Sequence, residues 1–188
     1  ADEWFSFDWR PCAACPHAGD ACGRHCEVWF GIPHDAIGGF LFEPGSSSGL
    51  VRFPPAKLIR SLVAAVRARG GLVLVNEVTT GVGRTGRWFG CEHFGTRPDL
   101  MPIAKAMSSG YLPIGGLMVA DRVAEVLIDK GGEFAHGLTW SGRPAACAVS
   151  VACLDIMRRE KVVERVRDEL AGYFAAKDKG FYEAEGLD

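Results

Sequence analysis

The stretch Leu72-Val73-Leu74-Val75-Asn76-Glu77 decides the fold of this chain. Its first four residues are apolar without alternation, which predicts a short strand buried on both faces of a parallel sheet. Two polar residues end the strand, and a glycine-rich turn, Gly81-Val-Gly-Arg-Thr-Gly86, follows. A strand, a polar end and a tight turn in this order are typical of an α/β domain whose site lies at the carboxyl ends of the strands.

Strand and helix patterns alternate on either side of this stretch. Short apolar runs predict three more strands, at Gly39–Glu43, Leu100–Ala104 and Gly116–Ala120. Helical spacing predicts one helix after Pro54-Pro55 and a second after Asp121, with Asp121 as the N-cap of that second helix. A third, long helix is predicted from Pro144 to about Ala176, with a break near Glu160. The alternation indicates an α/β fold, a mostly parallel sheet between helices.

Three predicted strands end in a polar residue, namely Glu43, Asn76 and Lys105. Carboxyl ends of parallel strands meet at one edge of a sheet, so we expect these residues to lie together. Lys105 precedes small residues that leave room for a ligand. A lysine at such a position is expected to lose solvation, which lowers its pKa and frees the amine as a nucleophile. The pattern alone leaves an alternative open, a buried lysine paired with Glu43 or Glu77.

Composition indicates an ordinary water-soluble domain. Among the 188 residues the net charge is −2 and the pI about 6.2, which gives no sign of a nucleic-acid or membrane partner. No apolar run is long enough to span a membrane, and the first residues, Ala-Asp-Glu-Trp, do not have the pattern of a secretory signal. We therefore expect a cytoplasmic protein with reduced thiols.

Four of the seven cysteines cluster near the N-terminus with the spacing C-x2-C-x6-C-x3-C: Cys12, Cys15, Cys22 and Cys26. Soft ligands this close could hold zinc. The spacing is not that of a standard zinc finger, so the expectation is a loop of reduced cysteines without metal.

Three motifs together resemble the class III aminotransferases, which depend on pyridoxal phosphate. They are Val75-Asn-Glu-Val-Thr-Thr-Gly-Val-Gly-Arg-Thr-Gly86, which is similar to the family's "DEV…GFGRTG", Ile103-Ala-Lys-Ala-Met-Ser-Ser-Gly-Tyr-Leu-Pro113, similar to "AKG…SGY.P", and His136-Gly-Leu-Thr-Trp-Ser-Gly-Arg-Pro144, similar to "HGFTYSGHP". Their order and spacing agree with the family, and the resemblance runs from about Phe40 to Val166.

The resemblance implies roles for five residues. Lys105 would form the Schiff base with the cofactor and, once freed, move the proton of the substrate carbon. Val78 would pack against the pyridine ring, and Thr139 would reach the cofactor phosphate of a neighbouring subunit in a homodimer. Glu43 matches a glutamate beside the substrate pocket. Asn76 stands where the family has an aspartate that keeps the pyridine nitrogen protonated, and a neutral amide cannot supply that charge.

The resemblance also implies a domain organisation. Residues 1–38 would enter the domain as a Cys-rich loop region, residues 39–176 would be the central part of the large domain that binds the cofactor, and residues 177–188 would start the connection to a small domain. Family members are much longer, so the chain is expected to be a central fragment of a longer protein.

The expected function is transfer of an amino group between an amine or amino acid and a 2-oxo acid. Two alternatives stay open. One is a non-transaminating enzyme of the same family, an aminomutase, racemase or decarboxylase. The other is a catalytically silent domain that keeps the fold as an interaction or metal-binding module, which Asn76, the missing termini and the cysteine cluster favour.

Overall fold

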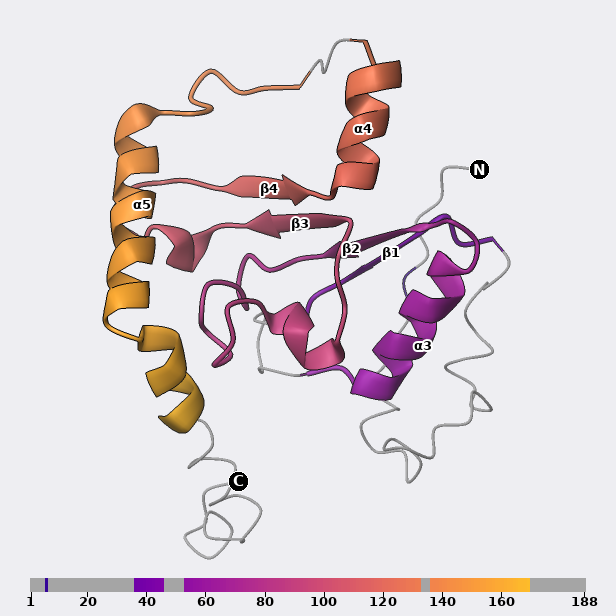
Figure 1. Ribbon diagram of the computed structural model, residues 1–188, viewed down its shortest axis with the longest axis horizontal. Helices are drawn as coiled ribbons and strands as arrows, with labels where there is room; N and C mark the ends of the chain where they lie inside the picture. Colours follow the sequence, from indigo (N-terminus) through magenta and orange to yellow (C-terminus); the bar gives the residue numbers. More distant parts are fainter. Residues whose placement is uncertain (1–5, 7–35, 46–52, 133–135, 170–188) are drawn as a thin grey trace, which may run out of the picture.

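The computed structural model describes residues 6, 36–45, 53–132 and 136–169. In these residues a four-stranded sheet carries one helix on a face and two helices near its ends (Figure 1). The strands are β1 (Gly39–Phe42), β2 (Leu72–Val75), β3 (Leu100–Ile103) and β4 (Gly116–Val119). The helices are α3 (Ala56–Arg67), α4 (Asp121–Lys130) and α5 (Pro144–Arg159), with 3-10 turns η1 (Gly90–Phe94) and η2 (Lys105–Met107).

The sheet has the order β1-β2-β3-β4, and its first three strands are parallel. The register of β1 and β2 pairs Gly39 with Leu72 and Phe42 with Val75, so both strands end at the same level. β4 returns antiparallel to β3, which makes the sheet mixed rather than fully parallel. The predicted α/β alternation is confirmed, and the predicted strands agree with the observed ones to within one residue.

The core lies between one face of the sheet and α3. Val73 and Val75 are fully buried on that face, and they pack with Leu58, Leu62 and Val66 from α3. The buried apolar residues of α3 are therefore spaced as expected for a helix that packs one face against a sheet. Leu72 and Leu74 on the other face are only partly buried, so the prediction that β2 is buried on both faces is wrong for this structure.

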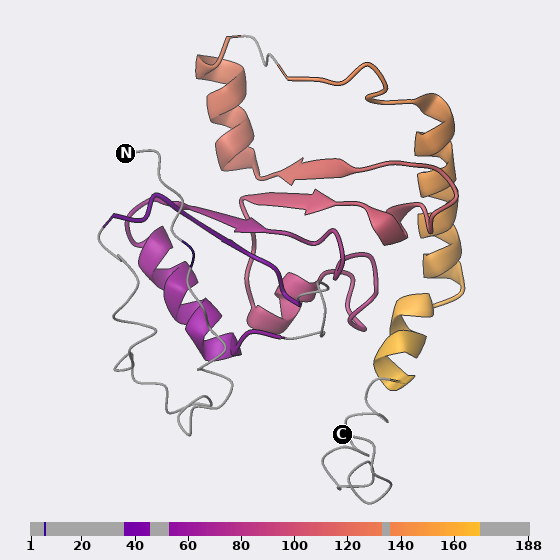
Figure 2. The same ribbon diagram turned by 180° about the vertical axis from the view of Figure 1, so that it is seen from behind.

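α3 and η1 cover the buried face, whereas α5 runs along the carboxyl ends of the parallel strands in both ribbon views (Figures 1 and 2). α5 contacts η2, the turn that follows β3. The predicted break near Glu160 is confirmed, because Glu160 and Lys161 form a turn before residues 162–169 become helical again.

The helix after β4 begins differently from the prediction. Asp121 is the first residue of α4, and Ala120 is its N-cap, without a side-chain hydrogen bond. The expected cap is therefore wrong. Asp121 instead places its carboxylate in the first turn, where the helix dipole favours a negative charge.

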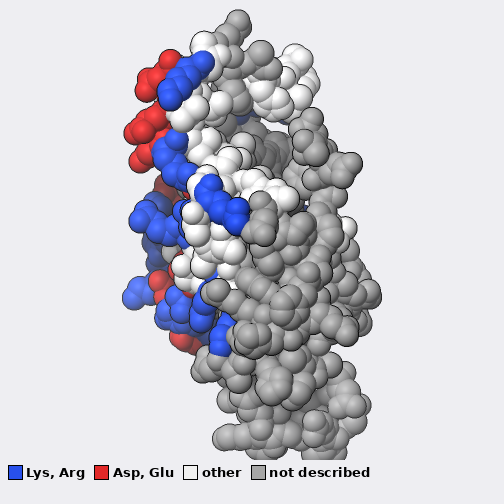
Figure 3. All heavy atoms as spheres, turned by 90° about the vertical axis from the view of Figure 1, so that its right-hand side faces the viewer, with Lys and Arg blue, Asp and Glu red and all other residues white. Residues whose placement is uncertain are grey.

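In the ranges that the structure describes, no helix has both the length and the apolar character needed to cross a membrane. The face that carries α3 and α4 has acidic and basic side chains side by side along one margin (Figure 3). This mixture of charges agrees with the small net charge of the chain.

Candidate active site

The carboxyl ends of β1 and β2 bring Glu43 and Asn76 together. Phe42 and Val75 are register partners, so the next residue of each strand faces the other across the sheet edge. The side-chain Nδ2 of Asn76 donates to Oε1 of Glu43 at 2.8 Å, and Oδ1 of Asn76 accepts from the N–H of Val78 at 3.1 Å. The expectation that the strand ends meet is confirmed for these two residues.

Lys105 follows β3, the next strand of the sheet, and starts η2. Its φ is +41°, a left-handed conformation that a lysine rarely adopts and that costs on the order of 1–3 kcal/mol. Strain of this kind collects at functional sites because the surrounding structure must hold it in place. The backbone at Lys105 therefore departs from regular structure directly after β3.

The amine of Lys105 donates to Oγ1 of Thr79 at 2.9 Å. The residue is exposed, so the expected loss of solvation is wrong for this structure. The described residues also place no ion pair between Lys105 and either Glu43 or Glu77. The alternative of a buried, paired lysine is therefore wrong too, because the turn after β2 offers the lysine a hydroxyl instead of a carboxylate.

Thr79 is the site residue that sequence reasoning missed. It lies one residue after Val78 in the turn that follows β2, and it joins Lys105 to the segment that carries Asn76. Its signal in the sequence is a hydroxyl pair, Thr79-Thr80, between a strand end and a glycine-rich turn. Such residues commonly satisfy turn backbone, so the pattern alone does not single out Thr79.

Glu77 holds the loop behind this site. Its side chain is 1% exposed and accepts three hydrogen bonds, from the hydroxyl of Thr80 at 2.6 Å and from the N–H groups of Gly90 at 2.9 Å and Cys91 at 2.6 Å. Burial, followed by the charge of Glu77, raises the pKa of the Cys91 thiol to about 12. Glu77 is therefore a structural anchor for the turn between β2 and η1.

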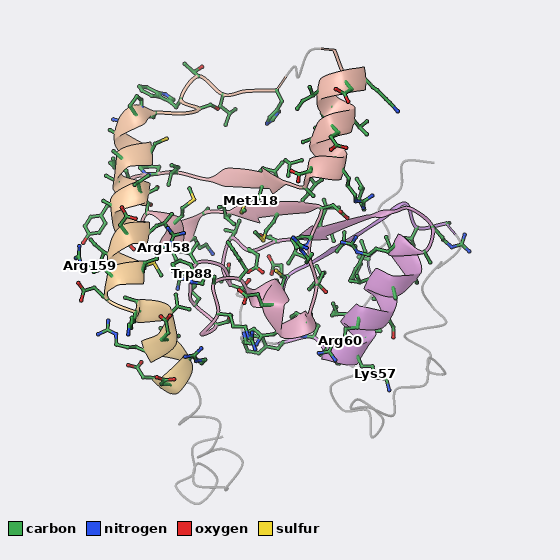
Figure 4. The ribbon with its side chains drawn as sticks, in the orientation of Figure 1. Lys57, Arg60, Trp88, Met118, Arg158 and Arg159 are labelled. Atoms are coloured by element: carbon green, nitrogen blue, oxygen red, sulfur yellow. The ribbon has the colours of Figure 1, made fainter. Side chains whose placement is uncertain are left out.

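The glycine-rich turn is fixed from its other side by α5 and the helical residues after it. The guanidinium of Arg158 lies 5.7 Å from the ring centroid of Trp88, a cation–π distance (Figure 4). Gly86 has φ +74°, and a Cβ there would lie 2.7 Å from the Cα of Arg167. Only glycine fits such a close approach, which explains the last glycine of the motif.

Asp99 anchors the opposite, amino end of β3. Its carboxylate is 3% exposed and accepts from the N–H of Val73 at 2.8 Å and from Nε of Arg122 at 2.7 Å, and Arg67 lies 3.6 Å away. The hydrogen bond from Arg122, with further help from Val73 and Arg67, lowers the pKa of Asp99 below its ordinary value of 3.8. This cluster ties α3 and α4 to the sheet, away from Lys105.

The structure describes no contact of Thr139 with the residues at the strand ends. Thr139 is exposed, in a turn of the segment between α4 and α5. Its hypothetical partner is a neighbouring subunit, so its role stays a prediction. Cys12, Cys15, Cys22 and Cys26 lie outside the described residues, and the prediction that they are reduced and metal-free stays a prediction as well.

Comparison with known proteins identifies the class to which this fold and site belong. The sequence pattern described as "Aminotransferase class-III" matches residues 14–176, which is most of the chain. The chain therefore belongs to the class III aminotransferase family, and its fold is that of the large domain of fold-type-I pyridoxal-phosphate-dependent transferases.

Individual relatives agree with this family. Putrescine–pyruvate aminotransferase of Pseudomonas aeruginosa is 42% identical over 142 residues, which cover 76% of this chain and 31% of that protein. The chloroplastic gamma aminobutyrate transaminase 3 of Solanum lycopersicum is 39% identical over 135 residues, 70% of this chain and 26% of that protein. The chain thus spans less than a third of the length of these relatives.

Solved structures of transaminases share the same arrangement. The thermostable (S)-enantioselective omega-transaminase from Thermomicrobium roseum superposes with a TM-score of 0.66 at 41% identity, over 70% of this chain and 30% of that one. An S-selective transaminase from an Arthrobacter species superposes with a TM-score of 0.72 at 28% identity, over 80% of this chain and 32% of that one.

Proposed function

We propose that this protein is a pyridoxal-phosphate-dependent aminotransferase that moves an amino group between an amine or amino acid and a 2-oxo acid, with Lys105 carrying the cofactor. The observation that supports this most directly is the position of Lys105. Its strained backbone follows a central parallel strand, and its amine reaches the turn after the neighbouring strand, 2.9 Å from Thr79. Family membership and the names of the relatives agree with this chemistry.

The groups at the strand ends fit pyridoxal phosphate. A primary amine at Lys105 suits the cofactor aldehyde, the apolar side chain of Val78 suits a ring face, and the amide of Asn76 suits hydrogen bonding with a ring nitrogen. The cofactor, when bound, supplies an electron-withdrawing ring that stabilises negative charge on the substrate carbon. The protein has to position the substrate, exclude water and move one proton.

Lys105 would have two duties in succession. It would hold the cofactor until the substrate amine displaces it, and its freed amine would then remove the proton from the substrate carbon. Thr79 would hold that amine near the turn after β2 by the hydrogen bond described above. Glu43 would lie beside Asn76, at the hydrogen-bond distance described above, and Thr139 would contact the cofactor phosphate of a neighbouring subunit, in a cytoplasmic homodimer.

Reduction with borohydride tests the central assignment. The cofactor-loaded protein should keep the cofactor covalently after reduction, and peptide mapping should place the adduct on Lys105. Lys105→Ala should lose the adduct, whereas Lys130→Ala, an exposed helix-end control, should keep it. An adduct on another lysine would overturn the assignment, and a colourless protein in excess cofactor would support the silent-domain alternative.

Product analysis separates transamination from the other reactions of the family. With an amine donor and pyruvate, an aminotransferase forms alanine and the carbonyl product of the donor in equal amounts. An aminomutase or a racemase would convert the donor without consuming pyruvate, and a decarboxylase would release carbon dioxide. The identity of the products therefore decides among these reactions.

A further inference from the structure

The amide of Asn76 has a single orientation that its two neighbours allow. Nδ2 donates to the carboxylate of Glu43 at 2.8 Å, and Oδ1 accepts from the N–H of Val78 at 3.1 Å. A flipped amide would place its oxygen against the carboxylate oxygen and its NH2 group against an N–H donor. Both contacts would be repulsive, so Glu43 and Val78 together fix the amide.

The same geometry places a negative charge one hydrogen bond away from Asn76. An ionised acceptor makes the hydrogen bond from Nδ2 about twice as strong as a neutral one. Within the described residues, Glu43 makes no ion pair that would compete for its charge. The register of β1 and β2 holds the two residues at adjacent strand ends, so the pairing is built into the sheet.

We infer that Glu43 is a positioning residue that acts through Asn76 and supplies, one hydrogen bond further out, the negative charge that the side chain of residue 76 lacks. This inference rests on the proposed function, because the group that would sense the charge is the ring nitrogen of pyridoxal phosphate at Asn76. Residues 43 and 76 then carry one negative charge between them, on Glu43 instead of on residue 76.

The inference predicts that Asn76→Asp alone does not restore the charge arrangement of the site. An aspartate there would bring a second carboxylate to hydrogen-bond distance of Glu43, with no proton between them. Like charges this close disfavour each other, so the two strand ends would separate or one carboxylate would take up a proton. The double variant E43Q/N76D keeps one negative charge and a hydrogen bond between the residues, with donor and acceptor exchanged.

The first measurement needs no cofactor. We expect N76D to lower the urea midpoint of the cofactor-free protein, and E43Q/N76D to recover most of that loss. Additive effects of the two substitutions would overturn the inference, because residues that act as a pair must show coupling in a double-mutant cycle.

The second measurement is titration of the purified protein with pyridoxal phosphate, followed by absorbance. E43Q keeps an oxygen that accepts from Asn76 but loses the charge, and E43A loses both. We expect both variants to bind the cofactor about tenfold more weakly, the factor that corresponds to ~1.4 kcal/mol. E43Q binding as tightly as wild type would overturn the inference, since orientation alone would then suffice.

The two proposals fail in different ways. Wild-type protein that takes up no pyridoxal phosphate would refute the proposed function, and with it the role of Glu43 toward the cofactor. Wild-type protein that binds the cofactor through Lys105 but is indifferent to E43Q and E43A would refute only the role of Glu43.

Discussion

Glu77→Ala should destabilise this protein severely, although Glu77 forms no ion pair with another described residue. The carboxylate is 1% exposed and accepts from two backbone N–H groups, those of Gly90 and Cys91, and from the hydroxyl of Thr80. The variant leaves two buried N–H donors without acceptors, at ~1–3 kcal/mol each. We therefore expect a loss of about 2–6 kcal/mol, a large part of the ~5–15 kcal/mol that stabilises a typical domain.

Glu77→Gln is the variant that tests the reasoning most closely. It keeps the volume and one acceptor oxygen, but it turns an NH2 group toward at least one of the donors. We expect a smaller loss than for Glu77→Ala, about 1–3 kcal/mol. Glu125→Ala on the exposed surface of α4 is the control and should change stability by no more than ~0.5 kcal/mol.

Urea unfolding of the cofactor-free protein, followed by tryptophan fluorescence and by circular dichroism, measures these differences. The midpoint should fall in the order Glu125→Ala, Glu77→Gln, Glu77→Ala, with an unchanged slope against urea. A Glu77→Ala midpoint equal to that of the control would refute the anchoring role of Glu77. Equal midpoints for Glu77→Gln and wild type would show that the hydrogen bonds to Gly90 and Cys91 do not need a carboxylate.

Two further predictions follow from shifted pKa values. Arg122 chiefly lowers the pKa of folded Asp99, so the ionised carboxylate stabilises the folded state fully above pH 3.8, and this stabilisation is lost as the pH falls through the folded pKa. Wild type and Asp99→Asn should therefore approach each other in free energy of unfolding below about pH 4. Urea unfolding at a series of acidic pH values measures this difference. Because burial and Glu77 raise the pKa of Cys91 to about 12, iodoacetamide at pH 8 should alkylate exposed Cys147 well before Cys91, and equal rates by mass spectrometry would contradict this.

The sequence alone determined the fold class and the strand ends. The unbroken apolar run Leu72–Val75 predicted a strand of a parallel sheet, because such strands are rich in apolar residues, although only one of its faces is fully buried. Helical spacing likewise predicted α3, and the break at Glu160 was visible in the pattern.

Only the tertiary structure decided which polar groups meet. The pairing of Asn76 with Glu43 spans 33 positions and depends on the register of β1 and β2, which no local pattern encodes. The contact of Lys105 with Thr79 spans 26 positions and depends on a strained backbone at the end of β3. Glu77 and Asn76 are adjacent in sequence, yet one turns into the protein as an anchor and the other toward the sheet edge, because successive side chains at a strand end point to opposite sides.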